Sequence, residues 1–323
     1  MRLVFLTDRL IRWLRLINQD VVSKVFSTLR LQSDFYFRAH FRGQFSVEVP
    51  RERRTVRFHL VREGECYLQI VGSTPLLIRK GDLVLIPDGA SQTLSSNTDL
   101  PAVSLPQILS ENTLENGVFS HGKGREQVSL LCGYCSFDEA IDHPLLTALP
   151  ALIVLNQVSL KDDPLLFSAL KLLSLEEERE LLGMSSILSR MLEIILIQVV
   201  RRATFGEAEY QTGFFAALRD PKLSKALSVI HNEPQVSWTI DSLAQQAGMS
   251  RARFASRFTD FIGAPPISYL TKWRLMKSRE LLGTTKLDME EIANRCGYSC
   301  ASSFSRRFKE EYKIGPGAFR KSA

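Results

Sequence analysis

The sequence predicts a multidomain α+β protein: an N-terminal β-barrel with helices after it, and an all-α C-terminal domain that holds two helix-turn-helix units. Three patterns support this prediction. From residue 34 to about residue 155, short alternating apolar segments are separated by Gly, Pro and Asp, as in small barrels and sandwiches. From Pro164 onward, apolar residues recur at helical spacing. Around Gly248 and again around Gly297, a helix pattern, a tight turn and an amphipathic basic helix pattern follow each other.

Length and charge describe a folded protein with one basic part. The chain has 323 residues, enough for about two domains, and its 45% hydrophobic and 24% charged residues are ordinary for a globular protein. Residues 215–323 carry 18 Lys and Arg against 10 Asp and Glu, a net charge of +8, whereas residues 1–214 carry a net charge of −2. The basic excess therefore points to a polyanionic partner for the C-terminal third alone.

The cysteine pattern and the N-terminus bear on the compartment. Five Cys, an odd number scattered among periodic segments, fit a reducing, cytoplasmic setting better than a disulfide framework. The first apolar residues are interrupted by Asp8 and Arg9, so residues 1–19 are interpreted as an N-terminal helix or leader and not as a signal peptide. The longest apolar run, which follows Glu193, is too short to span a bilayer, and we expect no membrane partner.

Residues 20–160 contain motifs of a known sensor domain. The segment FHLVREGECYLQI is followed by LIRKGDLVLIPDGASQTL, in which a Gly81-Asp82 turn leads to an apolar strand and a Pro87-x-Gly89 corner. Together with Gly64, and with LLCGYCSFD and HPLLTALP further on, these motifs resemble the cupin-type sensor domain of AraC-family regulators. The resemblance implies a cupin-like barrel.

Cupins that bind metal usually supply His from two of these strands. His59 stands in the first strand, but Gln92 occupies the position in the second where related sequences often carry His. An amide is a poor ligand for a transition metal, so we expect neither a metal nor a cofactor. The barrel is interpreted as a site for a small-molecule effector, with Arg57, His59 and Gln92 as candidate contacts, or as dimer architecture only.

Two other groups of residues in this half have alternative interpretations. Cys132 and Cys135 form a lone C-x-x-C, flanked at wider spacing by His121 and His143, which fits a redox pair or a zinc site. Spacing of three along a strand turns the two side chains to opposite faces, however, and favours two unrelated buried thiols. The run RERRTVR at residues 51–57 fits either a phosphate-bearing effector or a solvated strand edge protected by charge, of which the edge is the more common cause.

Residues 161–203 change to a helical pattern. Leu165, Leu166, Leu170 and Leu173 are expected to share one apolar stripe, and a second helix ends at Arg201 and Arg202. In AraC-type proteins such helices usually form the dimer interface, so the resemblance implies a homodimer. Residues 204–216 are interpreted as a linker.

The C-terminal domain is expected over residues 217–323. Its first helix-turn-helix covers about residues 240–261, a connecting helix residues 266–282, and its second helix-turn-helix about residues 289–311. Both units place Gly in the turn, Gly248 or Gly297, and then Phe at helical spacing. The motifs LAQQAGMS, RFTDFIGAPP, YLTKWRLMKSRELL and EIANRCGYSCASSFSRRFKEEYKIGPGAFR, in this order, resemble the DNA-binding domain of the AraC/XylS family.

This resemblance implies residue roles on the two second helices. Arg306 is the candidate for bidentate reading of guanine, whereas Arg307 and Lys309 are candidates for phosphate contacts. The alanines and Ser256 in the first unit indicate weaker base reading there. The candidate DNA-binding residues are Arg251, Ala252, Arg253, Ala255, Ser256, Arg257, Ala301, Ser302, Ser305, Arg306, Arg307 and Lys309.

The sequence therefore predicts a sequence-specific DNA-binding transcriptional regulator and not an enzyme. Its expected partners are double-stranded DNA, RNA polymerase, an unknown small-molecule effector and a second copy of the chain, and the family resemblance favours activation. Two alternatives remain at this stage: a cupin-type metal-dependent enzyme fused to a DNA-binding domain, and a DNA-binding protein that needs no effector.

Overall fold

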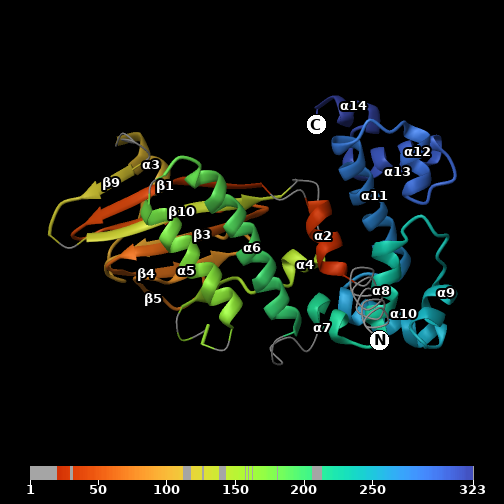
Figure 1. Ribbon diagram of the computed structural model, residues 1–323, viewed down its shortest axis with the longest axis horizontal. Helices are drawn as coiled ribbons and strands as arrows, with labels where there is room; N and C mark the ends of the chain where they lie inside the picture. The colour runs from red at the N-terminus through yellow and green to blue at the C-terminus, as the bar shows by residue number, and fades with distance from the viewer. Residues whose placement is uncertain are drawn as a thin grey trace, which may run out of the picture. The chain divides into compact units, whose positions relative to one another are not determined.

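The computed structural model describes residues 20–29, 32–111, 118–125, 127–137, 143–156, 158, 160–161, 163–179, 181–205 and 213–322. The predicted N-terminal helix or leader and residues 206–212 of the predicted linker lie outside this part. The chain divides into two compact units (Figure 1). The described parts of residues 31–139 and 149–200 form the barrel unit, and those of residues 1–30, 140–148 and 201–323 form the helical unit.

Two sheets form the barrel unit. The six-stranded sheet has the order β11-β6-β3-β10-β1-β9 and the five-stranded sheet the order β5-β4-β7-β2-β8. The strands are β1 (Gln32–Arg42), β2 (Ser46–Val49), β3 (Thr55–Glu63), β4 (Glu65–Ile70), β5 (Leu76–Arg79), β6 (Leu83–Ile86), β7 (Gln92–Ser95), β8 (Val103–Ser104), β9 (Val118–Gly122), β10 (Gln127–Ser136) and β11 (Ile153–Leu155). The pairs β1–β9 and β2–β8 are parallel and the others antiparallel. A short helix, α3 (Leu105–Glu111), follows β8.

The inward faces of both sheets close over one apolar core. Phe41, Phe45, Leu68, Ile78 and Phe119 are among its buried members. The Gly-Asp turn predicted from the sequence connects β5 to β6, where the Asp82 carboxylate accepts a hydrogen bond from the Arg79 amide at 2.9 Å. Gly89 has φ +54° and lies so close to the Glu52 carbonyl that a Cβ would overlap it, which explains glycine at this corner.

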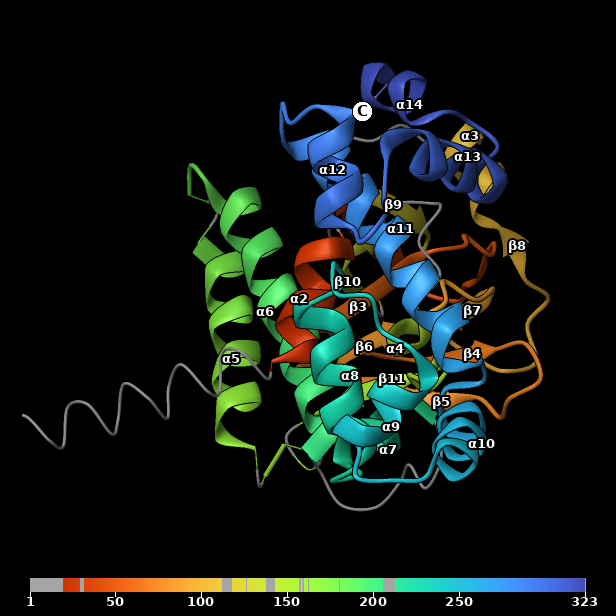
Figure 2. The ribbon, with the colours of Figure 1, turned by 90° about the vertical axis from the view of Figure 1, so that its right-hand side faces the viewer.

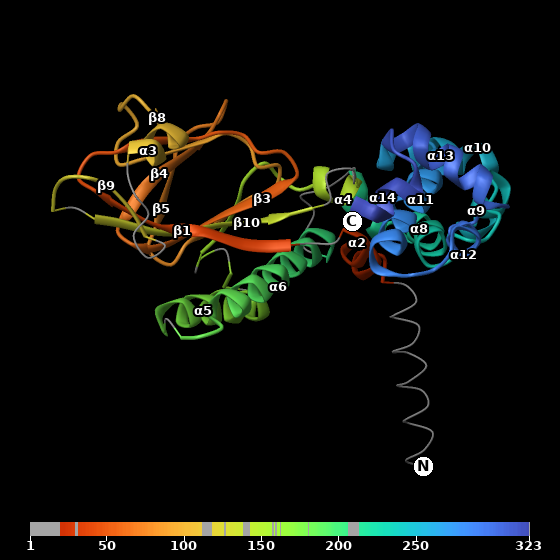
Figure 3. The ribbon, with the colours of Figure 1, turned by 90° about the horizontal axis from the view of Figure 1, so that it is seen from above.

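Two helices, α5 (Pro164–Arg179) and α6 (Met184–Phe205), lie along the outer face of the six-stranded sheet (Figure 3). Leu166, Leu170 and Leu173 of α5 are buried, but Leu165 is 62% exposed, so its predicted place on the buried stripe is wrong. An α-helix rotates by 100° per residue, so Leu165, next to the buried Leu166, lies off the side that faces the sheet. No helix among the described residues is long and apolar enough to cross a bilayer.

The helical unit contains the two expected helix-turn-helix pairs. Its described helices after the barrel are α7 (Gly213–Arg219), α8 (Leu223–Asn232), α9 (Ile240–Gln246), α10 (Arg251–Ile262), α11 (Pro266–Thr284), α12 (Met289–Arg295), α13 (Ala301–Tyr312) and α14 (Pro316–Ser322). Residues 213–216 of the predicted linker fall inside α7, because Phe214 and Phe215 bury their rings in this unit. With the barrel unit, this arrangement confirms the predicted multidomain α+β fold class.

The two helix-turn-helix pairs, α9 with α10 and α12 with α13, repeat with one irregularity. Gly248 and Gly297 are 49 residues apart, but the helix-capping residues Ser250 and Cys300 are 50 apart, so the second turn is one residue longer. The helices α10 and α13 end in left-handed residues at Gly263 and at Lys313, where φ is 62°. The structural counterpart of Gly263 is therefore Lys313.

Two short segments from the region before α5 also pack in the helical unit. The helix α2 (Val21–Leu29) contacts α8 and α11 (Figure 2), and α4 (Pro144–Thr147) contacts α7. Val25 and Leu29 of α2 are fully buried, as is Leu145 of α4. In sequence, α2 comes just before β1 and α4 follows β10, so the segments at either side of one strand pair belong to the helical unit.

Candidate nucleic-acid interface

The second helix of each pair is anchored by two phenylalanines. Phe254 and Phe258 of α10, and Phe304 and Phe308 of α13, have no exposed surface. Residues four apart lie on the same side of a helix, so this spacing turns both rings of each helix to the core and leaves the opposite side in solvent. In the second pair the core also contains Leu282, Ile292 and Phe319.

The twelve predicted DNA-binding residues all lie on α10 or α13. With the offset of 50 residues, the base-facing candidates of the two helices form matched pairs with the same exposure class: Ala252 with Ser302, Ala255 with Ser305, and Ser256 with Arg306. The two helices therefore present the same three positions to solvent, with small side chains on α10 and two hydroxyls and a guanidinium on α13.

Ion pairs separate the basic residues of this surface into two groups. Arg257 contacts the Asp220 carboxylate, with its Nε at 3.1 Å, and lies over the Phe261 ring. Arg251 pairs with Asp241 at 3.0 Å and Arg307 with Glu310 at 3.0 Å. In contrast, the side chains of Arg253, Arg306 and Lys309 form no hydrogen bond or ion pair with any residue that the structure describes, and all three are exposed.

The turn before α13 packs against Arg274 of the connecting helix α11 and against the loop between α8 and α9. Arg274 of α11 donates from Nε to the Pro234 carbonyl at 2.7 Å and from Nη2 to the Val236 carbonyl at 2.8 Å. Gly297 has φ +77°, and a Cβ there would lie 2.6 Å from the Pro234 oxygen and 2.7 Å from the Arg274 guanidinium. The glycine thus permits α11 and the second turn to pack directly.

Replacing Gly297 with alanine is expected to lower the free energy of unfolding of the helical unit by about 2 kcal/mol, from left-handed strain of about 1 kcal/mol and a further cost for moving Arg274. Gly248 has φ +61° but open space around it, so Gly248→Ala carries the strain alone and is the matched control. Urea unfolding followed by tryptophan fluorescence measures both; equal losses would show that the contact with Arg274 does not matter.

The candidate effector contacts meet only in part inside the barrel. His59 Nε2 accepts a hydrogen bond from the Gln92 amide nitrogen at 2.9 Å, and its Nδ1 lies 3.1 Å from the Cys132 sulfur. Burial and the Arg57 charge lower the pKa of His59 to about 3, so the imidazole is neutral. The Gln92 Oε1 atom is buried without a partner among the described residues.

Arg57 belongs to a different set of contacts. Its guanidinium donates to the Pro50 carbonyl at 2.6 Å and to Glu52 at 2.9 Å. It is buried on β3, which lies between β10 and β6, so the interpretation of residues 51–57 as a charged strand edge is wrong for Arg57. A crossover places β3 inside the sheet, and sequence spacing does not reveal strand order.

The two cysteines of the C-x-x-C have separate partners. Cys132 lies beside His59, whereas Cys135 accepts a hydrogen bond from the Ser33 hydroxyl at 3.1 Å. Burial raises the pKa of Cys135 to about 11 and that of Cys132 further, so both remain thiols. Among the described residues, no group of three His, Cys, Asp or Glu side chains is placed to hold a metal ion.

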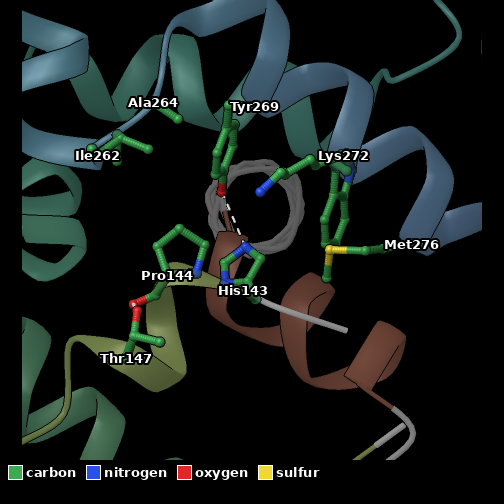
Figure 4. Close-up of a pocket in the computed structure, with 10 residues that line it drawn as sticks. His143, Pro144, Thr147, Ile262, Ala264, Tyr269, Lys272 and Met276 are labelled. Carbon is green, nitrogen blue, oxygen red and sulfur yellow. Dashed lines mark hydrogen bonds between the residues drawn. The ribbon is translucent and has the colours of Figure 1, made fainter. Parts of the chain in front are cut away.

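Sequence reasoning missed one buried polar chain in the helical unit. The Leu145 amide donates to His143 Nδ1 at 3.1 Å, His143 Nε2 lies 3.0 Å from the Tyr269 hydroxyl, and that hydroxyl lies 2.7 Å from His231 Nε2. Figure 4 shows His143 directed from α4 toward Tyr269 on α11, beside a pocket of about 230 Å³. Tyr269 is 126 positions from His143 and 38 positions from His231 in the sequence, and at these separations periodicity carries no signal.

Both parts of the chain are similar to known protein families. The profile of a family described as Cupin matches residues 20–204, and one described as Helix-turn-helix domain matches residues 243–322. The regulator AlkR of Acinetobacter baylyi is 28% identical over 311 residues, 94% of this chain and 100% of its own length. The regulator MtrA of Neisseria gonorrhoeae is 27% identical over 94% of this chain and 98% of its own. A solved AraC-type regulator from Chromobacterium violaceum is 28% identical, with a TM-score of 0.31 over 32% of this chain and 94% of that chain.

Proposed function

The chain belongs to the cupin-containing AraC-type transcriptional regulators. From this premise we propose that α10 and α13 are the two helices of each copy that read DNA, and that α13 makes most of the contacts with bases. The protein is a DNA-binding transcription regulator, as are its relatives.

One observation carries the assignment of the helices. Arg306 is exposed, has no partner among the described residues, and stands at the position matched by Ser256 in α10. A free guanidinium on an exposed helix face can reach a guanine edge with two parallel hydrogen bonds. Arg257 is engaged by Asp220, which favours a role in positioning α10. Selection of bound fragments from genomic DNA, followed by affinity measurements on the recovered site and on random duplexes, tests sequence-specific binding by the full chain.

Replacing Arg306 with alanine is expected to weaken binding to the specific site by about 1–3 kcal/mol and to relax preference at one base position. Lys309→Ala removes a nearby positive charge from the same helix and should weaken specific and random duplexes alike, with a salt slope smaller by about one. Fluorescence anisotropy at several salt concentrations measures both variants. Equal losses on specific and random DNA for both would contradict the division of roles.

The barrel is the proposed effector site. His59 and Gln92 form a neutral, buried hydrogen-bonded pair, and the unpartnered Gln92 oxygen offers an acceptor to a ligand that donates a hydrogen bond. An effector bound here would bias the placement of the two DNA-binding domains of a dimer. Thermal-shift screening of metabolites against the wild type and Gln92→Leu tests this; a stabilising compound whose effect is unchanged in the variant would place the site elsewhere.

Helices α5 and α6 are the proposed dimer surface. Both expose large apolar side chains on the side away from the sheet, namely Leu165, Leu172, Leu175, Ile187 and Ile194. Apolar surface gathered on neighbouring helices is typical of an interface between copies. Leu172→Glu combined with Ile194→Glu is expected to convert a dimer to a monomer in sedimentation experiments, whereas Val71→Glu, at an apolar residue exposed elsewhere on the barrel, should not.

The remaining parts of the proposal follow from family resemblance. The expected role is cytoplasmic activation through contact with RNA polymerase, which in vitro transcription with purified polymerase tests directly. The rival is a cupin enzyme, which requires a metal held by a His and Glu ligand set. Metal analysis of the purified protein discriminates, because stoichiometric iron or manganese that is lost in His59→Ala would favour the enzyme.

A further inference from the structure

A cavity of about 480 Å³ opens to solvent on the helical unit, bounded by α2, α8, α11 and α12. Lys24 and Thr28 of α2 form one wall, and Trp273 and Lys277 of α11 form another. The volume is within the range of sites that enclose small molecules. None of the twelve predicted DNA-binding residues lines this cavity, so it is separate from the proposed base-reading surface.

The buried polar chain fixes the hydrogen positions of one residue in this cavity. His143 accepts the Leu145 amide at Nδ1, so its neutral ring carries hydrogen on Nε2 and donates to the Tyr269 oxygen. The Tyr269 hydroxyl then donates to His231 Nε2 at 2.7 Å. Because a neutral imidazole has one hydrogen, His231 carries it on Nδ1.

Two buried donors of the cavity wall thus lack acceptors. His231 and Trp273 are 3% and 2% exposed, their ring centroids are 4.1 Å apart, and both line the cavity. Neither His231 Nδ1 nor Trp273 Nε1 has a partner among the described residues. An unsatisfied buried donor is costly, so two of them side by side indicate that an acceptor enters from the cavity.

The charges around the cavity favour an acceptor with negative charge. Lys24, Lys277 and Arg295 line it. Lys277 pairs with the Glu280 carboxylate at 2.7 Å, and the Thr28 hydroxyl donates a hydrogen bond to the same carboxylate. Arg295 pairs with Glu291 at 2.7 Å. The Lys24 ammonium has no carboxylate partner among the described residues, so the surroundings keep a net positive charge. Buried donors and surplus positive charge together recognise an oxyanion.

We propose that this cavity binds a small oxyanion, a metabolite bearing a carboxylate or a phosphate group, whose oxygens accept from His231 Nδ1 and Trp273 Nε1 and pair with Lys24. The ligand contacts α2 on one side and α8, α11 and α12 on the other. Because it bridges α2 to the other three helices, its binding stabilises the packing of α2 in the helical unit. Since α2 directly precedes β1 in the chain, the site is a second regulatory input, distinct from the barrel.

The indole N–H of Trp273 provides a direct test in the full chain. Its resonance in a ¹H–¹⁵N spectrum is assigned by its disappearance in Trp273→Phe. Titration with inorganic phosphate and, separately, with citrate to about 10 mM should move this resonance saturably with one of the anions. Chloride at matched ionic strength should leave it in place. A response to phosphate alone or to citrate alone identifies the preferred class, and either outcome supports the proposal.

A charge-matched pair of variants locates the site. Lys24→Ala is expected to weaken anion affinity about tenfold, because a charge-assisted hydrogen bond is lost. Lys225→Ala removes an exposed lysine from α8 that does not line the cavity and should leave the affinity unchanged. Equal weakening in both variants would attribute binding to net charge and overturn the proposal, as would an indole resonance that neither anion moves.

A titration with duplex DNA separates a free anion from a backbone phosphate. If the cavity holds a free oxyanion, DNA should not displace phosphate or citrate, and Lys24→Ala should leave DNA affinity unchanged in the absence of the anion. If DNA alone moves the Trp273 indole resonance and competes with the anion, the cavity residues contact the nucleic-acid backbone and the proposal is wrong. The indole readout does not depend on DNA binding, so its outcome is independent of the proposed roles of α10 and α13.

Discussion

Acidification from pH 7 to pH 5 is expected to lower the free energy of unfolding of the helical unit by about 4 kcal/mol, because two buried histidines are neutral there. Burial lowers the pKa of His143 to about 3, and burial together with neighbouring His143 lowers the pKa of His231 well below its ordinary value. In the unfolded chain both pKa values return to about 6.5. Below pH 6.5 only the unfolded chain takes up these protons, so stability is fully present above pH 6.5 and falls by about 2 kcal/mol per histidine at pH 5.

Urea unfolding at pH 7.0, 6.0 and 5.0, followed by the fluorescence of Trp238 and Trp273, measures this dependence. His143→Gln and His231→Gln should each remove about half of the slope below pH 6.5, at the cost of lower stability at pH 7. His121→Gln, on β9 of the barrel unit, is the control and should leave the slope unchanged. If the double glutamine variant keeps the wild-type slope, the acid sensitivity arises elsewhere.

The sequence was most informative where local pattern determines structure. Pro164, predicted as the beginning of the helical region, is the first residue of α5, because proline suits a first helical turn. The Phe254–Phe258 and Phe304–Phe308 spacing fixed which side of α10 and α13 is buried. The opposite side, with the candidate DNA contacts, followed from the same periodicity. The chemical roles of those side chains stay predictions.

The sequence was least informative where distant segments meet. Neither α2 nor α4 carries a signal of its partner, because each is short and its buried residues contact helices more than 50 positions away. Arg57 was interpreted from its neighbours along the chain, but its position inside the sheet depends on strand order. Glu177 was hidden in an acidic run that is typical of a solvated helix face.

Replacing Glu177 with alanine is expected to lower the free energy of unfolding of the barrel unit by about 3 kcal/mol. The Glu177 carboxylate is 1% exposed and forms ion pairs with Arg38 of β1, whose Nε lies 2.8 Å from Oε1, and with Arg62 of β3. It therefore connects α5 to two strands of the six-stranded sheet. Its loss leaves two guanidinium groups, 17% and 25% exposed, without their buried counter-charge, and water can reach only part of each.

Two variants separate charge from packing in this ion-pair group. Glu177→Gln keeps the size and one acceptor oxygen, so it should cost about half as much as alanine if the contact is partly a packing and hydrogen-bonding effect. Glu178→Ala removes an exposed carboxylate one position along the same helix and should change the free energy of unfolding by less than about 0.5 kcal/mol. Urea unfolding followed by circular dichroism measures all three. A loss in Glu178→Ala equal to that in Glu177→Ala would mean that α5 depends on its acidic run as a whole, whereas the structure places the anchor of α5 at a single buried carboxylate.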